Sequence, residues 1–386
     1  MTSVKVLSAQ TILPQDADSA LLVGRVWSKA AGGPCPVLVS RDRLLDLTSL
    51  SATLSGLLEL EDLVEALRSH ASFPDLGSLE QFFDGSAGEL LAPTDLQAIK
   101  AAGVTFADSM LERVIEEQAK GDPLRAQEIR GRLAPVLGDN LKGLVAGSEK
   151  AAEVKKLLQE LGLWSQYLEV GIGPDAEIFT KAQPMSSVGC GAQIGIHPKS
   201  DWNNPEPEVV LAVASTGKIV GATLGNDVNL RDFEGRSALL LSKAKDNNAS
   251  CSIGPFIRLF DEKFTLEDVK QAEIALSVEG ADGFTMTGLS PMAAISRSPE
   301  DLVSQLLNDN HQYPDGVVFF LGTMFAPVKD RRGAGLGFTH EIGDRVEIST
   351  PRLGRLINWV ENSDRCPKWN FGLGALMKNL AQRGLL

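Results

Sequence analysis

The sequence predicts an α+β protein with two parts, a smaller mixed α/β domain over residues 1–165 and a mainly β domain over residues 166–386. Two observations predict this division. Before about residue 165, apolar residues recur at helical spacing in several segments, whereas after it short β-like runs are separated by glycines. The length of 386 residues also exceeds what one compact domain usually needs, so two domains are expected.

The helices and strands of the first region follow from its apolar periodicity. Met110, Leu111, Val114 and Ile115 form one apolar face of a helix that Asp122-Pro123 ends. No combination of side chains in this region points to a particular chemistry. The predicted strands are 21–27 and 36–39, and the predicted helices are 62–70, 107–120, 124–133 and 150–161.

The second region begins with a hairpin signal. Two apolar runs, 208–214 and 219–224, flank the turn residues Ser215-Thr216-Gly217-Lys218. Ser298-Pro299-Glu300-Asp301 is typical of a helix start, because a serine cap precedes proline and two early acids. The other predicted elements are a helix over 298–307 and strands over 317–321 and 345–348.

Charge and composition narrow the class of partner. The formal net charge is −13, which opposes binding to a phosphate backbone or an anionic membrane surface, so neither nucleic acid nor membrane is expected as a partner. The N-terminus has no long apolar stretch typical of a signal peptide, and no apolar run is long enough to span a bilayer. The four cysteines are scattered, so reduced thiols in a cytoplasmic protein are expected.

The most informative segment is Glu206-Pro207-Glu208. In extended chain the two glutamates point to the same side, and their mutual repulsion is relieved by a hard cation such as Mg²⁺ or Mn²⁺. Taken alone, the pair is also typical of a solvated strand end. Asp227 follows after one strand, a turn and a returning strand, so it supplies a third carboxylate. Lys245 lies further along, as an anion-binding or basic group or simply as a surface charge.

These segments resemble the fumarylacetoacetate hydrolase family over roughly residues 166–360, with order and spacing both matched. Lys245 lies where that family keeps its active-site lysine, and Ile342 replaces a usual proline. The matching blocks are Phe179-Thr180-Lys181 with Ser186-Ser187-Val188-Gly189, Glu206-Pro207-Glu208 with Leu211-Ala212-Val213, Asn226-Asp227-Val228 with Arg231-Asp232, Gly322-Thr323, and Gly343-Asp344 with Val346-Glu347-Ile348.

The resemblance implies a fumarylacetoacetase-like β-roll in the second domain and a homodimer or higher homo-oligomer. It also implies a divalent metal, Mg²⁺ or Mn²⁺, held by Glu206, Glu208 and Asp227. The remaining implied site residues are Lys245, Glu177 and Glu234 as catalytic groups and Lys181, Ser187, Arg231, Thr323 and His197 as substrate-binding groups.

Within the family, the sequence is most similar to the 2-keto-3-deoxy-pentonate dehydratases. Phe233-Glu234-Gly235-Arg236-Ser237 and Glu177 match these enzymes, whereas the hydrolases commonly carry glutamine at the position of Glu234. The expected reaction is dehydration of a small 2-keto acid to 2-oxoglutarate semialdehyde. Two alternatives stay open: a hydrolase of 2,4-diketo acids in which His197 activates water, and a catalytically silent binding protein.

Overall fold

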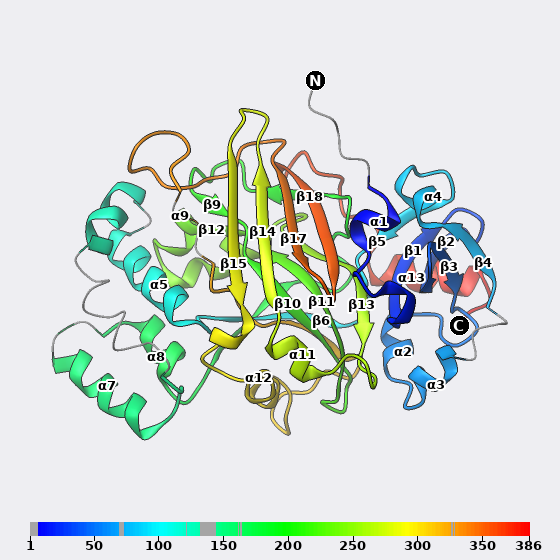
Figure 1. Ribbon diagram of the computed structural model, residues 1–386, viewed down its shortest axis with the longest axis horizontal. Coiled ribbons are helices and arrows are strands. Elements are labelled where there is room, and N and C mark those ends of the chain that lie inside the picture. The colour runs from blue at the N-terminus through cyan, green and yellow to red at the C-terminus, as the bar shows by residue number, and fades with distance from the viewer. Residues whose placement is uncertain are drawn as a thin grey trace.

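A computed structural model describes residues 7–68, 73–120, 122–131, 144–160, 162, 164–325, 327 and 329–386. The fold is mixed α/β and rich in sheet, as the sequence predicts. A central sheet region lies between the N-terminal unit (residues 7–91) at one end and the helices α5, α7 and α8 at the other (Figure 1). Within the described residues, no helix is both long and apolar enough to cross a membrane.

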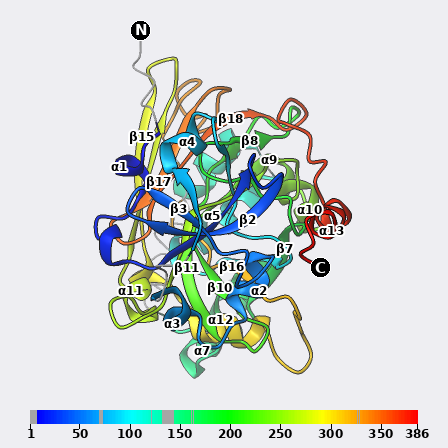
Figure 2. The same cartoon turned by 90° about the vertical axis from the view of Figure 1, so that its right-hand side faces the viewer.

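The N-terminal unit is a small sheet with short helices around it, and it faces the viewer in Figure 2. The predicted strands at 21–27 and 36–39 correspond to β1 and β2. The predicted helix at 62–70 corresponds to α3, and residues 69 and 70 lie outside the described part. Its elements are α1 (Ala9–Ile12), β1 (Leu22–Ser28), β2 (Gly33–Ser40), β3 (Arg43–Asp46), α2 (Leu54–Leu58), α3 (Leu63–Arg68), β4 (Asp75–Ser78), α4 (Leu79–Phe83) and β5 (Gly88–Leu91).

Strand β6 (Ala98–Gly103) leads into a helical layer and strand β7 (Glu177–Ala182) leads out of it. The layer contains α5 (Ala107–Ala119), a helix over 123–131, α7 (Glu149–Glu160) and α8 (Gln166–Ile172). The predicted helix at 107–120 corresponds to α5, and the one at 150–161 to α7, with residue 161 outside the described part. The one predicted at 124–133 is helical up to residue 131, and its last two residues lie outside the described part.

One long sheet joins the N-terminal unit to the centre of the molecule. Its strand order is β4-β3-β2-β1-β13-β11-β10-β16-β6-β7, with β5 also paired to β1. The predicted hairpin is β10 and β11, in which Val210 lies opposite Thr223. The strands not yet introduced are β10 (Pro207–Val213), β11 (Ile219–Asp227), β13 (Cys251–Leu259) and β16 (Val317–Phe320).

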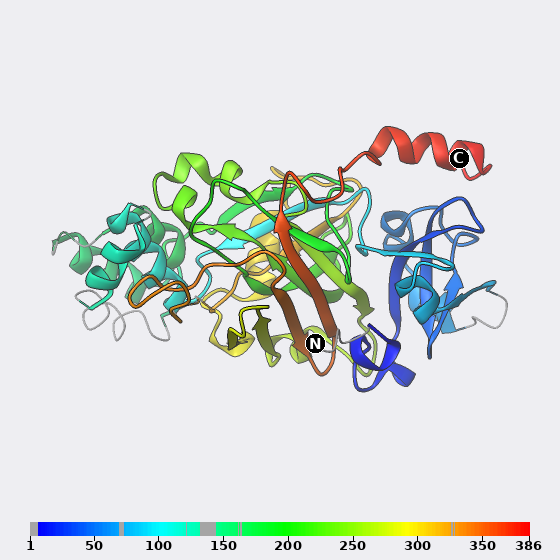
Figure 3. The ribbon, with the colours of Figure 1, turned by 90° about the horizontal axis from the view of Figure 1, so that it is seen from above.

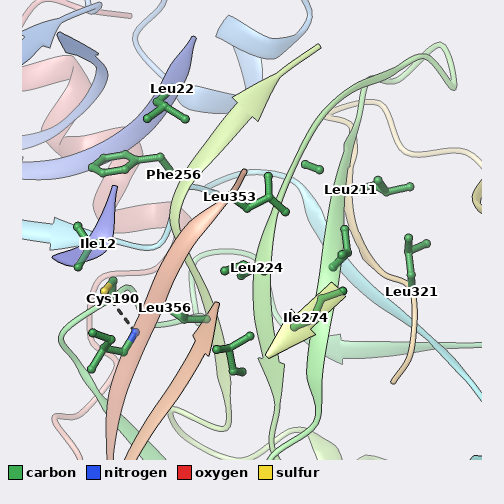
Figure 4. Close-up of a cluster of buried hydrophobic side chains, with 14 of the residues drawn as sticks. Ile12, Leu22, Cys190, Leu211, Leu224, Phe256, Ile274, Leu321, Leu353 and Leu356 are labelled. Atoms are coloured by element: carbon green, nitrogen blue, oxygen red, sulfur yellow. Dashed lines mark hydrogen bonds between the residues drawn. The ribbon is translucent and has the colours of Figure 1, made fainter. Parts of the chain in front are cut away.

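A second sheet of five strands, in the order β15-β14-β17-β18-β8, packs against this one. Side chains of both sheets meet in one core, where Leu211 and Leu224 of the long sheet lie near Ile274 and Leu356 of the second (Figure 4). The second sheet consists of β8 (Gln193–Ile196), β14 (Glu273–Glu279), β15 (Thr285–Pro291), β17 (Arg345–Thr350) and β18 (Gly354–Asn362). Helices α11 (Leu266–Lys270) and α12 (Pro299–Leu306) lie below it in Figure 1.

The C-terminal helix α13 (Leu373–Gln382) returns to the N-terminal unit (Figure 3). Asn379 Nδ2 donates to the Gly32 carbonyl at 2.8 Å, and Arg383 Nη1 donates to the Pro34 carbonyl at 2.7 Å. The C-terminal helix is therefore held to the N-terminal unit at the start of β2.

The junction between the N-terminal unit and the central sheet depends on Phe256. A Cβ added at Gly24 of β1 would lie 2.5 Å from Phe256 Cδ1 of β13, so the ring packs directly on that backbone. We expect Phe256→Ala to lower the free energy of unfolding by about 3–5 kcal/mol, measured by urea titration. Leu239, which is 94% exposed, offers a control whose change to alanine should cost under about 0.5 kcal/mol. Equal effects of the two changes would contradict this account.

Candidate metal and active site

Three buried carboxylates meet at the end of the β10–β11 hairpin. Glu206, Glu208 and Asp227 each offer an oxygen, and these oxygens lie within 4.8 Å of one another. The sequence places them there because Glu206 and Glu208 alternate along extended chain at the start of β10, while Asp227 ends the neighbouring strand. The Asp227 amide donates to the Glu206 carbonyl at 3.1 Å, which fixes the two elements in register.

Two buried lysines contact the carboxylate cluster. Lys245 Nζ, at the end of α10 (Leu241–Lys245), donates to Glu206 Oε2 at 2.5 Å and to Asp227 Oδ2 at 2.9 Å. Lys181 Nζ lies 2.9 Å from Asp227 Oδ1 on the other side and also donates to the Val228 carbonyl. Burial opposes the charge of Lys245, but Asp227 and Glu206 outweigh it and raise its pKa.

The pKa values of the carboxylates are shifted in different directions. Burial raises the pKa of Asp227, yet Lys181 and Lys245 overcome this and lower it below its usual value. By contrast, burial and then the charges of Asp227 and Glu206 raise the pKa of Glu208 well above its usual value. In the described part of the chain Glu208 has no ion-pair partner, and its Oε2 accepts from the Gly322 amide at 2.6 Å. Such an oxygen-rich, incompletely neutralised cluster fits a hard divalent cation.

Helix α5 supplies a site residue, Arg113, that could not be selected from the sequence. Arg113 Nη2 donates to Glu206 Oε1 at 2.6 Å, and its Nη1 donates to Glu234 Oε2 at 2.6 Å and to Glu116 Oε2 at 2.8 Å. Both oxygens of Glu206 therefore accept from cationic side chains, one from Arg113 and one from Lys245. In the sequence, Arg113 belongs only to a charged face of a helix, and such a face is equally typical of a helix exposed to solvent.

Arg231, which was predicted to bind substrate, is held by the same helix. Its guanidinium lies 2.6 Å from Glu116 Oε1 and 3.1 Å from Glu112 Oε2, and it donates to the Pro327 carbonyl at 3.2 Å. Its Cζ also lies 4.3 Å from the ring centroid of Trp202. Arg231 thus anchors α5 over the cavity as well as lining it.

Only some of the site residues predicted from the sequence line the cavity between these groups. Its lining includes the three carboxylates together with Lys245, Glu177, Glu234, Arg231 and Thr323. The predicted residues Lys181, Ser187 and His197 do not line it. Lys181 lies behind Asp227, Ser187 is buried elsewhere, and the His197 ring packs against Phe233 with centroids 5.3 Å apart. The structure thus places these three residues outside the cavity lining, and Lys181 orients Asp227.

Glu177 begins β7 and lines the cavity. It is the register partner of Gly103 at the end of β6, where a Cβ would lie 2.1 Å from Glu177 Oε2, so the missing side chain at 103 leaves room for this carboxyl. Burial, and then the charge of Glu234, raise the pKa of Glu177 to about 7. A carboxyl with this pKa can both accept and release a proton near neutral pH.

The cavity has a volume of about 40 Å³, enough for a few water molecules at most. The Arg113–Glu206 ion pair lies on the α5 side of this cavity, and it occupies an oxygen that the carboxylate cluster would offer to a cation.

We therefore expect Arg113→Met to bind Mg²⁺ several-fold more tightly than the wild type, because the change removes both a competitor for Glu206 and a nearby positive charge. Isothermal titration with Mg²⁺, or Mn²⁺ binding followed by electron paramagnetic resonance, measures this affinity. Arg130, which pairs with Glu112 away from the carboxylates, supplies the control Arg130→Met, whose affinity should not change. Weaker binding by Arg113→Met would contradict the competition.

Comparison with known protein families agrees with this geometry. The model of the fumarylacetoacetate (FAA) hydrolase C-terminal domain matches residues 155–361, more than half of the chain. The chain belongs to the fumarylacetoacetate hydrolase family. It is 32% identical over 213 residues to a "probable 2-keto-3-deoxyxylonate dehydratase" of Haloferax volcanii, covering 55% of this chain and 68% of that protein.

A second relative, the 2-dehydro-3-deoxy-D-arabinonate dehydratase of Saccharolobus solfataricus, is 33% identical over 185 residues, which cover 48% of this chain and 58% of that protein. Among solved structures, a 2-keto-3-deoxy-D-arabinonate dehydratase complexed with magnesium and 2,5-dioxopentanoate superposes with a TM-score of 0.62. The alignment covers 89% of this chain and 99% of that one at 21% identity, and it shows a shared fold. That structure contains magnesium, and the carboxylate cluster here fits the same ion.

Proposed function

We propose that this protein is a metal-dependent dehydratase that converts a 2-keto-3-deoxy-pentonate to 2,5-dioxopentanoate, the semialdehyde of 2-oxoglutarate. The observation that carries the proposal is that Glu177 and Lys245 line the same cavity as the carboxylate cluster. Elimination of water from a 2-keto acid needs one group to remove a C3 proton and another to protonate the departing C4 hydroxyl. The names of the two sequence relatives support the same substrate class.

Glu206, Glu208 and Asp227 would hold Mg²⁺ or Mn²⁺, which supplies Lewis-acid stabilisation to the 2-oxo group of a bound acid. Deprotonated Glu177 takes the C3 proton. Lys245, kept protonated by Asp227 and Glu206, gives a proton to the C4 hydroxyl as it leaves. Lys181 keeps Asp227 in position from behind. Glu234 places Arg113 beside this chemistry rather than moving a proton itself.

The alternative reaction that the sequence left open is hydrolysis of a 2,4-diketo acid. In that reaction His197 was expected to activate the attacking water. Among the described residues that line the cavity there is no histidine, and the Nδ1 atom of His197 accepts from the Lys199 amide in a loop outside the cavity. The site therefore favours dehydration.

In line with the sequence, we further propose that the protein acts in pentose catabolism without phosphorylated intermediates. We also propose a cytoplasmic location and a homo-oligomeric state.

The direct test is incubation of the purified protein with Mg²⁺ and 2-keto-3-deoxy-D-xylonate, or with the D- or L-arabinonate analogues. Chromatography of the products should detect 2,5-dioxopentanoate, and a chelator should abolish it. Release of pyruvate from a 2,4-diketo acid, without turnover of any of the deoxy acids, would overturn the proposal in favour of the hydrolase.

A further inference from the structure

Two asparagines lie side by side in the wall of the same cavity. Asn204 of β9 (Asn203–Asn204) is the direct register partner of Asn229 of β12 (Asn229–Leu230) in a two-stranded sheet, and both side chains line the cavity. They are almost fully buried, with exposures of 2% for Asn204 and 0% for Asn229. We call Asn204 and Asn229 the amide pair.

The amide pair has hydrogen-bonding capacity that the protein leaves unused. The Nδ2 of Asn204 donates to the Pro205 carbonyl at 2.9 Å. Within the part of the chain that the structure describes, Asn204 Oδ1 has no hydrogen-bond partner, and neither do Oδ1 and Nδ2 of Asn229. Buried amides without partners are costly and uncommon. Asn358 shows the usual case, because its Oδ1 accepts from Ser252 and its Nδ2 donates to the Gly189 and Ala192 carbonyls.

The amide pair lies close in sequence to the carboxylate cluster. Asn204 lies two residues before Glu206, and Asn229 lies two residues after Asp227. Two residues of extended chain span about 7 Å. A five-carbon acid whose 2-keto end lies at the carboxylates is therefore long enough for its far end to reach the amide pair.

The chemistry of the amide pair specifies which group it would bind. The unpartnered atoms are two acceptors, Oδ1 of Asn204 and of Asn229, and one donor, Nδ2 of Asn229. A neutral hydroxyl matches this set, because it donates one hydrogen bond and accepts another. A second carboxylate does not match, since it offers only acceptors to a site with two acceptors.

We propose that Asn204 and Asn229 bind the oxygen on C5 of the substrate and thereby select 2-keto acids that carry a terminal hydroxyl. This inference rests on the proposed dehydration, and it assigns a role to the end of the substrate that does not lose water.

The C5 oxygen also changes during the reaction, in a way that the amide pair accommodates. Breaking the C3–H and C4–O bonds gives water and 5-hydroxy-2-oxopent-3-enoate. Transfer of one proton from C5 to C3, and of the hydroxyl proton to C4, then gives 2,5-dioxopentanoate. The C5 oxygen starts as both donor and acceptor and ends as an aldehyde acceptor. Asn229 Nδ2 can donate to this oxygen throughout, whereas only the hydroxyl can donate to one of the two Oδ1 atoms.

The test compares two ligands that cannot lose water because they have no C4 hydroxyl, 5-hydroxy-2-oxopentanoate and 2-oxopentanoate. Their Kd values are measured by titration calorimetry with the full-length protein in Mg²⁺. We expect the wild type to prefer the hydroxylated ligand by about tenfold or more. Asn229→Ala should reduce this preference to near one, and Asn229→Asp, which has the same size but no Nδ2 donor, should reduce it as well.

Measuring Tm distinguishes a loss of ligand binding from a loss of folding stability in these variants. Asn229→Ala should not lower Tm, because Asn229 loses no partner within the protein, whereas the control Asn358→Ala should lower Tm and keep the preference. Absence of a preference in the wild type, including absence of binding, or an unchanged preference in Asn229→Ala, would overturn the inference. Because neither ligand is turned over, a preference that Asn229→Ala abolishes supports the amide pair even if no deoxy acid is dehydrated.

Discussion

Glu208→Gln is expected to abolish turnover while leaving the metal-free protein at least as stable as the wild type. Burial and then the charges of Asp227 and Glu206 raise the pKa of Glu208, so removing this carboxylate relieves repulsion in a buried site. A cation loses one of three protein ligands. The wild type should gain about 2.7 kcal/mol in unfolding free energy at 100 times the Kd for Mg²⁺, and the variant should lose this gain. Urea titrations with and without Mg²⁺ measure both effects.

Asp227→Asn provides the contrast, because its carboxylate accepts from two buried lysines. Its removal leaves those ammonium groups without their counter-charge, and we expect a loss of about 3–5 kcal/mol even without metal. Both variants should be inactive, with opposite effects on metal-free stability. If Glu208→Gln destabilises the metal-free protein as much as Asp227→Asn does, then the two carboxylates do not differ in their electrostatic contribution to stability as described here.

Glu177→Gln is expected to lower kcat by about 10²–10⁴-fold, the range for loss of a general base. Because the pKa of Glu177 is raised to about 7 and the base acts when deprotonated, wild-type activity should rise with pH through about 7. The residual activity of the variant should lack this rise. Initial rates between pH 5.5 and 8.5, with Mg²⁺ held saturating, measure the profile.

Glu117→Gln supplies a control for that experiment, since Glu117 lies on α5 and contacts Gln166 outside the cavity. Its pH profile should match the wild type. A wild-type rate that falls with pH through about 7 would mean that Glu177 acts as the proton donor, and it would contradict the assignment of roles made above.

Much of the carboxylate site could be predicted because its signals are local. Glu206, Glu208 and Asp227 belong to one hairpin, whose strands and turn are readable from alternation and from Ser215 to Lys218. Secondary-structure elements with strong periodicity, such as α5 and α7, were also predictable. The long sheet was not, because its order depends on pairs such as β1 with β13 that are distant in sequence.

The contribution of α5 to the site could not be predicted for a different reason. A helix with one apolar and one charged face normally turns its charges to solvent, and no local pattern shows that Arg113 instead meets Glu206 from the opposite wall. Helix α5 also lies before the predicted boundary at residue 165, whereas the site residues that the sequence indicated lie after it. The partnerless state of Asn229 is likewise visible only in three dimensions, since asparagine in a turn-rich segment is ordinary.

The pairing of β1 with β13, and of the α13 segment with the start of β2, has a consequence for synthesis on the ribosome. At roughly 5–20 residues per second, β1 emerges tens of seconds before its inner neighbour is made. During that interval its edge lacks the partner that the finished sheet provides, and such an edge can pair with other chains. Helix α13 is translated long after β2 and then joins it, so the N-terminal unit is completed only once α13 has left the ribosome.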